Sequence, residues 1–349
     1  MSTATSTAQR LMSGLAVVAV LSTAATWSAE LPFLKALRIS PLIVGILMGA
    51  VVGNTAGSRL PAAWGEGITF SAKKILRLAI ILYGFRITFS QIAAVGVGGF
   101  ILDVFMVSIT LILGVFIGTR WLGMDKETAI MTSAGAAICG AAAVVATEPV
   151  VKAEAHKTAI AVATVVIFGT TAMFLYPLVY RTGLVPMTED VFGIYIGASV
   201  HEVAHVVGAG EAVSAATANT AVIVKMTRVM LLAPALLCIG WFLNRQTEQT
   251  DGAASKLVIP WFAVGFVLVA GFNTMDFLPA DVVTAIIDID TFLLTMAMTA
   301  LGLSTVVSKF KGIGWKPIQL AFILAVWLVV GGYVLTQVLV GSGLGAQLS

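Results

Sequence analysis

Residues 133–143 have the sequence Ser-Ala-Gly-Ala-Ala-Ile-Cys-Gly-Ala-Ala-Ala, a run almost free of bulky side chains in a very apolar chain. Gly135 and Gly140 lie within this run, which permits either close packing of small residues between helices or local unwinding. We favour unwinding, because the freed N–H groups and positive dipole end of a broken helix can face an anion. The segment therefore predicts a discontinuous helix that contributes to a binding site.

The composition places this helix in a membrane protein. Hydrophobic residues make up 59% of the 349 residues and charged residues only 11%, which is not the composition of a soluble domain. A membrane span needs about 20 apolar residues, and we identify eleven such segments. They begin near Leu11, Pro41, Phe70, Phe100, Thr128, Thr158, Val191, Asn219, Leu257, Val282 and Pro317. The sequence thus predicts an all-α polytopic membrane protein, and its net charge of +3 gives no reason to expect a nucleic-acid partner.

Lysine and arginine are distributed unevenly between alternate loops, and cytoplasmic loops carry the excess. One side of the predicted topology has Arg10, Arg59, Lys73, Lys74, Arg120, Lys126, Arg181, Arg245, Lys256, Lys309, Lys311 and Lys316. The other side has Lys35, Arg38, Lys152 and Lys157. We therefore expect a multi-pass protein of the cell inner membrane with a cytoplasmic N-terminus, and eleven spans then place the C-terminus outside.

Weak internal similarity predicts a repeat. Three pairs of segments match in the same order at a spacing of about 150 to 160 residues, as expected for transporter repeats. They are Gly45–Val52 with Gly193–Val200, Lys74–Arg77 with Lys225–Arg228, and Thr128–Ala134 with Thr291–Ala297. We predict two inverted five-helix repeats, 40–182 and 183–349, after an extra helix in 1–39. The counterpart of the broken helix would then contain Met298–Gly302, where a break is less obvious.

Ionisable groups at bilayer depth are costly and usually functional. Five such residues in the predicted spans are therefore candidates for a functional site: His201, Glu202, His205, Lys225 and Arg228. Lys225 and Arg228 lie on one helix face and could hold two oxygens of an oxyanion, unless Glu202 and Asp103 neutralise them. We expect the substrate site to contain Gly135, Ala136, Cys139, Gly140, Ser199, His201, Lys225 and Arg228. Glu202 and His205 are expected to form a polar core or to couple transport to protons.

The residues His201-Glu202-Val203-Ala204-His205 also match the H-E-x-x-H pattern of zinc proteases, which places two histidines on one helix face. A third ligand is needed, and Glu211, which could still ligate, occupies the position where an extended zinc motif has its next histidine. The spans offer few further acidic ligands, namely Asp103, Asp288 and Asp290. We therefore expect no metal and no cofactor. An intramembrane zinc protease is kept as one alternative, and a non-transporting membrane scaffold or sensor as another.

Four motifs resemble the signatures of the YeiH-like sulfate exporter family. They are Leu76–Thr88, Gly135–Ala141, Ser199–Ala204, and Lys225 with Arg228 ahead of Pro234. The resemblance covers nearly the whole chain, although the family usually has glutamine at the position of His205. It implies membership in the superfamily of cation/proton antiporters and bile-acid symporters, with inverted repeats, crossed broken helices and a homodimer.

Together, the residues and the resemblance predict a secondary transporter rather than an enzyme. We expect it to export a small inorganic or organosulfur anion, namely sulfate, sulfite or a sulfonate, by alternating access. Protons are the expected coupling partner, because His201 and Glu202 could titrate in the working pH range.

Overall fold

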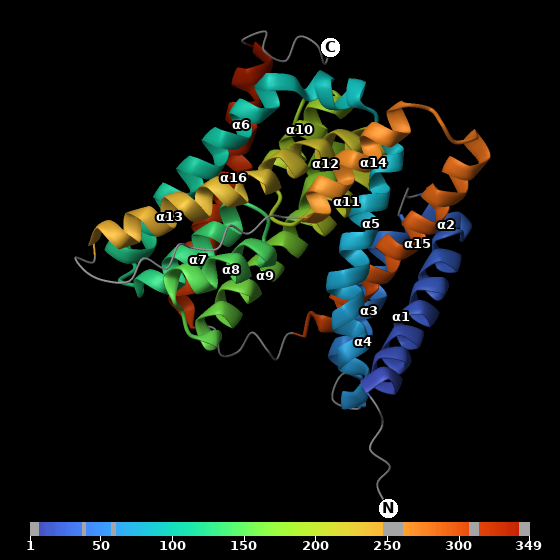
Figure 1. The fold of residues 1–349 in the computed structure, drawn as a ribbon, viewed down its shortest axis with the longest axis horizontal. Helices are drawn as coiled ribbons and strands as arrows, with labels where there is room; N and C mark the ends of the chain where they lie inside the picture. Colours follow the sequence, from blue (N-terminus) through green and yellow to red (C-terminus); the bar gives the residue numbers. More distant parts are fainter. Residues whose placement is uncertain (1–6, 37–39, 57–60, 247–260, 307–313, 342–349) are drawn as a thin grey trace, which may run out of the picture. The chain divides into compact units, whose positions relative to one another are not determined.

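A computed structural model describes residues 7–36, 40–56, 61–246, 261–306 and 314–341, and these residues form helices and no strand. Six helical stretches among them are long and apolar enough to cross a membrane. The chain divides into two compact units, whose helices are drawn in Figure 1. Unit 1 comprises residues 1–89 and 262–311, and unit 2 comprises residues 90–261 and 312–349.

Unit 1 is built mainly from a tightly packed helix pair. Its elements are α1 (Thr7–Ala29), α2 (Pro32–Ala36), α3 (Pro41–Thr55), η2 (Ala62–Trp64), α4 (Gly65–Phe70), η3 (Ser71–Ile75), α5 (Leu76–Tyr83), η4 (Gly84–Arg86), most of α14 (Trp261–Thr274), and α15 (Ala280–Ser304). A Cβ at Gly49 or Gly53 of α3 would collide with the backbone of α15 at Thr299 or Leu303. The glycines therefore let α3 approach α15 closely, as small residues do between membrane helices.

Unit 2 combines long helices with half-length ones. Its elements are α6 (Phe89–Phe116), η5 (Ile117–Trp121), α7 (Lys126–Ala137), α8 (Ala141–Val151), α9 (Ala155–Arg181), α10 (Glu189–Ser199), α11 (Val203–Glu211), α12 (Ala215–Met230), α13 (Leu232–Gln246) and α16 (Trp315–Gly341). At about 1.5 Å per residue, α7, α8, α10 and α11 are each too short to cross a bilayer alone. How these short helices connect therefore determines the topology of the unit.

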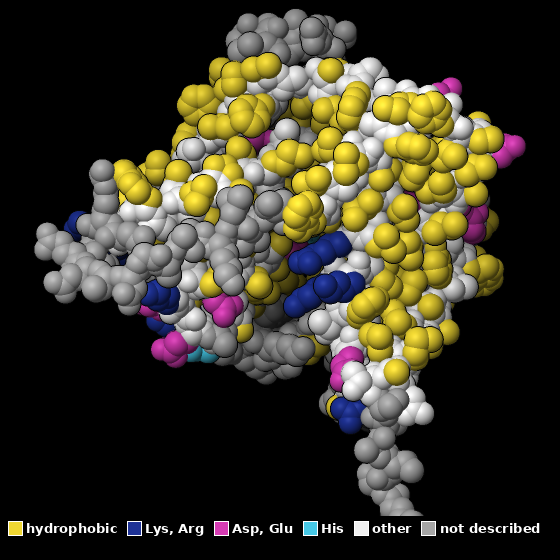
Figure 2. Space-filling view, viewed as in Figure 1, with side chains coloured by type: hydrophobic (Ala, Val, Ile, Leu, Met, Phe, Trp, Pro, Cys, Tyr) yellow, Lys and Arg dark blue, Asp and Glu magenta, His cyan; other side chains and the backbone are white. Residues whose placement is uncertain are grey.

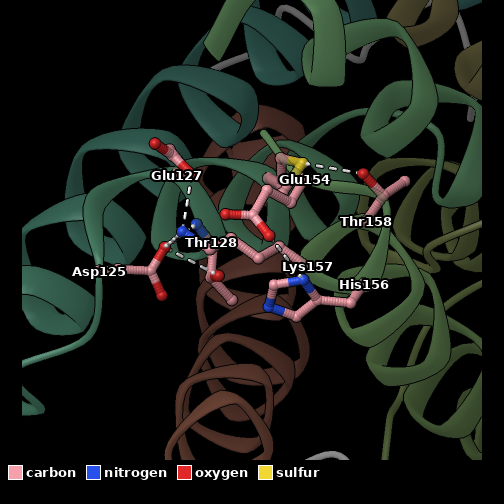
Figure 3. A network of polar contacts seen from close by, with 8 residues as sticks. Asp125, Glu127, Thr128, Glu154, His156, Lys157 and Thr158 are labelled. Atoms are coloured by element: carbon pink, nitrogen blue, oxygen red, sulfur yellow. Dashed lines mark hydrogen bonds and ion pairs between the residues drawn. The ribbon is translucent and has the colours of Figure 1, made fainter. Parts of the chain in front are cut away.

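Helices α7 and α8 form a hairpin rather than one crossing helix. Asp125, which precedes α7, lies 3.1 Å from the Nζ atom of Lys157 in the first turn of α9, and Glu127 lies 2.7 Å from the same atom (Figure 3). Because only three residues separate α8 from α9, both ends of the pair lie at one end of unit 2. We call α7–α8 the first hairpin, its tip 138–140, and this end of unit 2 the Lys157 end.

Helices α10 and α11 form a second hairpin that enters from the opposite end. Ser214, just before α12, donates a hydrogen bond to Glu189 Oε2 at 2.6 Å, so the chain has returned to the start of α10. Arg181, the last residue of the 27-residue helix α9, donates to the Ala212 carbonyl at 2.8 Å. The second hairpin, with its tip at 200–202, therefore starts and ends at the far end of α9, which we call the Glu189 end.

These hairpins correct two sequence predictions. The segments beginning near Thr128 and Val191 do not cross the unit, so two of the eleven predicted spans are hairpins. The predicted break in the first repeat is present, since α7 ends at Ala137 and α8 begins at Ala141. The suggested counterpart at Met298–Gly302 lies in the continuous helix α15, and the second break lies at 200–202 instead.

The five-helix repeats stay a prediction. Each predicted repeat contributes helices to both compact units, so the units are not the repeats themselves. Unit 2 does contain one internal pattern, a hairpin followed by a long helix. It occurs first in α7–α9 and then, entering from the opposite end, in α10–α12.

The surface is suited to lipid. Hydrophobic side chains cover much of the described surface of both units in the view of Figure 2. Large hydrophobic residues that are exposed in the structure include Phe105, Ile112, Trp261 and Leu268. Acidic, basic and histidine side chains gather where Figure 1 places the starts of α7 and α9. A largely apolar described surface is typical of a protein that spans a membrane.

Candidate functional site

The tips of the two hairpins share one cation. The Nζ atom of Lys225 on α12 donates to the Ile138 carbonyl at 2.8 Å and to the Val200 carbonyl at 2.6 Å. Lys225 is fully buried. Because the two acceptors belong to different hairpins, Lys225 joins the tips inside unit 2.

Arg228, one turn further along α12, binds the ends of the same two helices. Its Nε donates to the Ala137 carbonyl at 2.5 Å, its Nη2 to the Ala136 carbonyl at 3.2 Å, and its Nη1 to the Ala198 carbonyl. The last carbonyls of a helix lack partners within it and carry partial negative charge. Lys225 and Arg228 thus act as buried C-terminal caps for α7 and α10.

The positive end of α8 faces a side chain of the second hairpin. Glu202 Oε1 accepts a hydrogen bond of 3.3 Å from the N–H of Ala141, the first residue of α8. Gly140 makes this approach possible, because its φ is +73° and a Cβ there would collide with the Glu202 side chain. The helix end expected to receive a substrate anion therefore holds a carboxylate of the protein itself.

Two buried histidines lie beside this carboxylate. His205 Nδ1 is 3.6 Å from Glu202 Oε2, and its Nε2 is 3.3 Å from the Thr170 hydroxyl. The ring packs against α9 at Gly169, where a Cβ would come within 2.6 Å of Nδ1. Within the described residues, the Nδ1 atoms of His201 and His205 have no hydrogen-bond partner. Unsatisfied buried nitrogens of this kind leave hydrogen-bonding capacity for a ligand or a proton.

Two further predicted site residues lie at or next to the tips. Cys139 and Ser199 are buried, at the first and second break respectively. The Ser199 hydroxyl accepts a hydrogen bond from Tyr176 at 2.8 Å and donates to the Tyr195 carbonyl. The structure therefore brings all the predicted site residues together within unit 2, and it adds Tyr176 and Thr170 of α9. These two were not predicted, because nothing in a long apolar helix marks which face meets the tips.

The geometry does not match a helical zinc motif. Helix α11 begins at Val203, so His201 lies in the break and does not share a helix face with His205. No group of three or more potential metal ligands occurs among the described residues. The expectation that both histidines project from one helix face is wrong, since the chain is extended at Glu202.

The fold and this centre define a class: a polytopic membrane protein with two opposed hairpins whose tips meet at buried charges. The family model described as "Conserved hypothetical protein 698" matches residues 13–321. The chain belongs to this family, that of the UPF0324 membrane proteins, which confirms the resemblance to YeiH.

Relatives cover almost the whole chain. A UPF0324 membrane protein of Bacteroides thetaiotaomicron is 48% identical over 332 residues, covering 94% of this chain and 98% of the relative. The UPF0324 inner membrane protein YeiH of Escherichia coli K12 is 49% identical over 326 residues, covering 93% of each chain. No solved structure matches the chain. The family membership is therefore firm, and the relatives' names describe a membrane protein without a stated substrate.

Proposed function

We propose that the protein is a secondary transporter that exports a small anion such as sulfate, sulfite or a sulfonate by alternating access. The observation that carries this proposal is the meeting of two opposed hairpins at Lys225. Discontinuous helices that meet at mid-depth are typical of transporter binding sites, where half-helix N-termini face anionic groups. Under this proposal the protein is a carrier rather than an enzyme.

The anion would bind at the N-terminal end of α8, with Gly140, Cys139, Ser199 and His201 around it. Glu202 now occupies that helix end through Ala141, so an incoming anion would compete with an internal carboxylate. Protonation of Glu202, with His205 beside it, would weaken this competition and couple anion binding to a proton. Lys225 and Arg228 would supply positive potential while their N–H groups hold the tip carbonyls.

The charges of unit 2 support a membrane orientation for the proposed carrier. The Lys157 end carries Arg120, Lys126, Lys152, Lys157 and Lys316, the last bound to the Gly123 carbonyl at 3.2 Å, whereas Arg181 lies at the Glu189 end. Cytoplasmic loops carry the excess of such charges, so we place the Lys157 end in the cytoplasm. An inside-negative potential favours export of an anion by about 2.3 kcal/mol per charge per 100 mV.

Accessibility labelling tests this orientation. In a background that lacks the two native cysteines, an impermeant thiol reagent should label an Arg181→Cys variant from outside intact cells. It should reach a Lys152→Cys variant only after the membrane is opened. The reverse pattern would show that the protein has the opposite orientation in the membrane.

Anion binding is tested by thermal unfolding of the purified protein with sulfate, sulfite, thiosulfate, taurine, small carboxylates and zinc. Binding to the folded state raises stability in proportion to ln(1 + [L]/Kd). We expect one sulfur oxyanion to stabilise the wild type selectively and to lose this effect in His201→Ala. The matched control is His156→Ala, since His156 is exposed at the Lys157 end. A shift with zinc alone would favour the metalloprotease, and no shift with any ligand a scaffold or sensor.

A further inference from the structure

Asp103 is a buried acid that is not part of the proposed anion site. It lies in the long helix α6, and its side chain is fully buried. Oδ2 accepts a hydrogen bond of 3.0 Å from the Thr227 hydroxyl, whereas Oδ1 has no hydrogen-bond partner among the described residues. An ionised carboxylate in this position is costly unless a proton or a cation compensates it.

The two nearby cations do not compensate Asp103 directly. Lys225 and Arg228 lie on the same helix as Thr227 and act on Asp103 through space. Their hydrogen bonds go to backbone carbonyls at the hairpin tips and at the ends of α7 and α10, and no ion pair within 4.0 Å joins either of them to Asp103 in the described part of the chain. Further along α6, at Gly114, the neighbouring helices α7 and α16 present Ser133 and Leu324, which carry no charge.

The Thr227 hydroxyl offers a way to accommodate two protonation states. It has one proton, but three acceptors lie within reach: Asp103 Oδ2 at 3.0 Å, the Val224 carbonyl at 2.7 Å and the Ile223 carbonyl at 3.2 Å. When Asp103 is ionised, Thr227 can donate to it. When Asp103 is protonated, its O–H can donate to the Thr227 oxygen while Thr227 donates to Val224.

We propose that Asp103 is a proton-binding site that gains and releases a proton, with Thr227 exchanging its hydrogen-bond acceptor between the two states. The exchange requires rotation of two hydroxyl protons and no displacement of a helix. Loss of the proton adds one negative charge next to the helix that holds both hairpin tips through Lys225 and Arg228. This site does not depend on the identity of the anion or on Glu202.

Infrared difference spectroscopy of the purified full-length protein tests the proposal, because a protonated carboxyl has a C=O stretch that a carboxylate lacks. The spectrum is recorded while pH is varied over the range in which the protein stays folded. We expect a band that grows on acidification and is missing in Asp103→Asn. Thr227→Val should move its onset to higher pH, since the ionised state loses its donor, and Thr227→Ser should restore the wild-type onset.

Two results would overturn the proposal. An Asp103 band that is missing at every pH would mean a permanently ionised residue that only balances the cations. A band of constant height would mean a permanently neutral hydrogen-bonding group. If Asp103→Asn does not fold, the shift between Thr227→Val and Thr227→Ser still identifies the Asp103 band, and an onset that is the same in both variants would contradict the role of Thr227.

Discussion

Unit 1 and unit 2 compensate buried cations in different ways. In unit 1, Arg86 donates to Asp290 at 3.1 Å, to Thr291 at 2.6 Å and to the Ile287 carbonyl at 3.3 Å. In unit 2, Lys225 and Arg228 are bound by the carbonyls of helix ends, and no acid forms an ion pair with them among the described residues.

The difference indicates different tasks. An acid that pairs with Arg86 cannot change its protonation state without disrupting a contact between η4 and α15. When backbone carbonyls compensate the cations, Asp103 and Glu202 stay available for a proton or for exchange with a ligand. We therefore interpret the buried charges of unit 1 as structural and those of unit 2 as functional.

The largest effect is expected from Arg228→Met, which leaves three buried carbonyls unpaired. Each unsatisfied buried group costs about 1–3 kcal/mol, so the free energy of unfolding should fall by at least about 3 kcal/mol. Arg228→Lys should recover part of this loss, because lysine keeps the charge but not the forked geometry. Thermal unfolding measures the series, with exposed Arg120→Met as the control. Wild-type stability in Arg228→Met would contradict the capping role.

Asp290→Asn and Asp103→Asn compare the two units directly. We expect Asp290→Asn to cost about 3 kcal/mol, because it removes one partner of a buried ion pair. Asp103→Asn should change stability by less than about 1 kcal/mol, since asparagine can still bond Thr227. Equal losses in the two variants would remove the distinction between structural and functional acids.

Gly140→Ala should disturb the tip more than its backbone strain alone explains. The matched control is Gly183→Ala, because Gly183 has φ of +72° and open space around it, whereas Gly140 contacts Glu202. We expect about 1 kcal/mol of strain in each variant and a further loss in Gly140→Ala as Glu202 is displaced. If thermal unfolding shows the same loss of stability in both variants, the contact between Gly140 and Glu202 does not contribute to stability.

The smallest effect concerns the Lys157 end. Partial burial raises the pKa of Asp125, but hydrogen bonds from Thr128 and Lys157 more than offset this and leave the pKa below its usual range. Asp125 therefore stabilises the fold above its unfolded pKa of about 4, and this contribution is lost as pH falls through the lower folded value. Asp125→Ala should cost about 1 kcal/mol near neutral pH, with the difference from wild type shrinking in acid as the part that depends on the carboxylate charge is lost.

A cap-preserving variant separates the two roles of Asp125. Asp125→Asn keeps an acceptor for the Thr128 N–H but loses the charge that attracts Lys157. Its loss should therefore be smaller than that of Asp125→Ala. An Asp125→Ala difference that persists unchanged into strong acid would show that the carboxylate charge is not involved.

Parts of the fold were predictable from local sequence. The small residues around Gly135 and Gly140 indicate the first break, because glycine tolerates the positive φ that the tip requires. Val200 and His201 give no such signal at the second break. Hydropathy also cannot separate a hairpin of two half-length helices from one span, since both occupy about the same number of apolar residues.

The two missed hairpins offset each other in the charge count. Because the first hairpin does not cross, Lys152 and Lys157 lie on the same side as Arg120, and Arg181 lies on the opposite side. Because the second hairpin does not cross either, all later loops keep the side that the sequence predicted for them. The excess of basic residues on one side therefore survives the correction. The partners of Lys225 and Arg228 were not predictable, because a carbonyl becomes an available acceptor only where a helix ends.

The shared cation has a consequence for biosynthesis. Lys225 lies 87 residues after Ile138 in the chain. At about 5–20 residues per second, the ribosome finishes the first hairpin roughly ten seconds before it produces the lysine that caps its tip. During that interval the tip carbonyls need water or another provisional partner. The cap on the first tip can therefore form only after α12 has been made, so the two hairpins are joined late in the synthesis of unit 2.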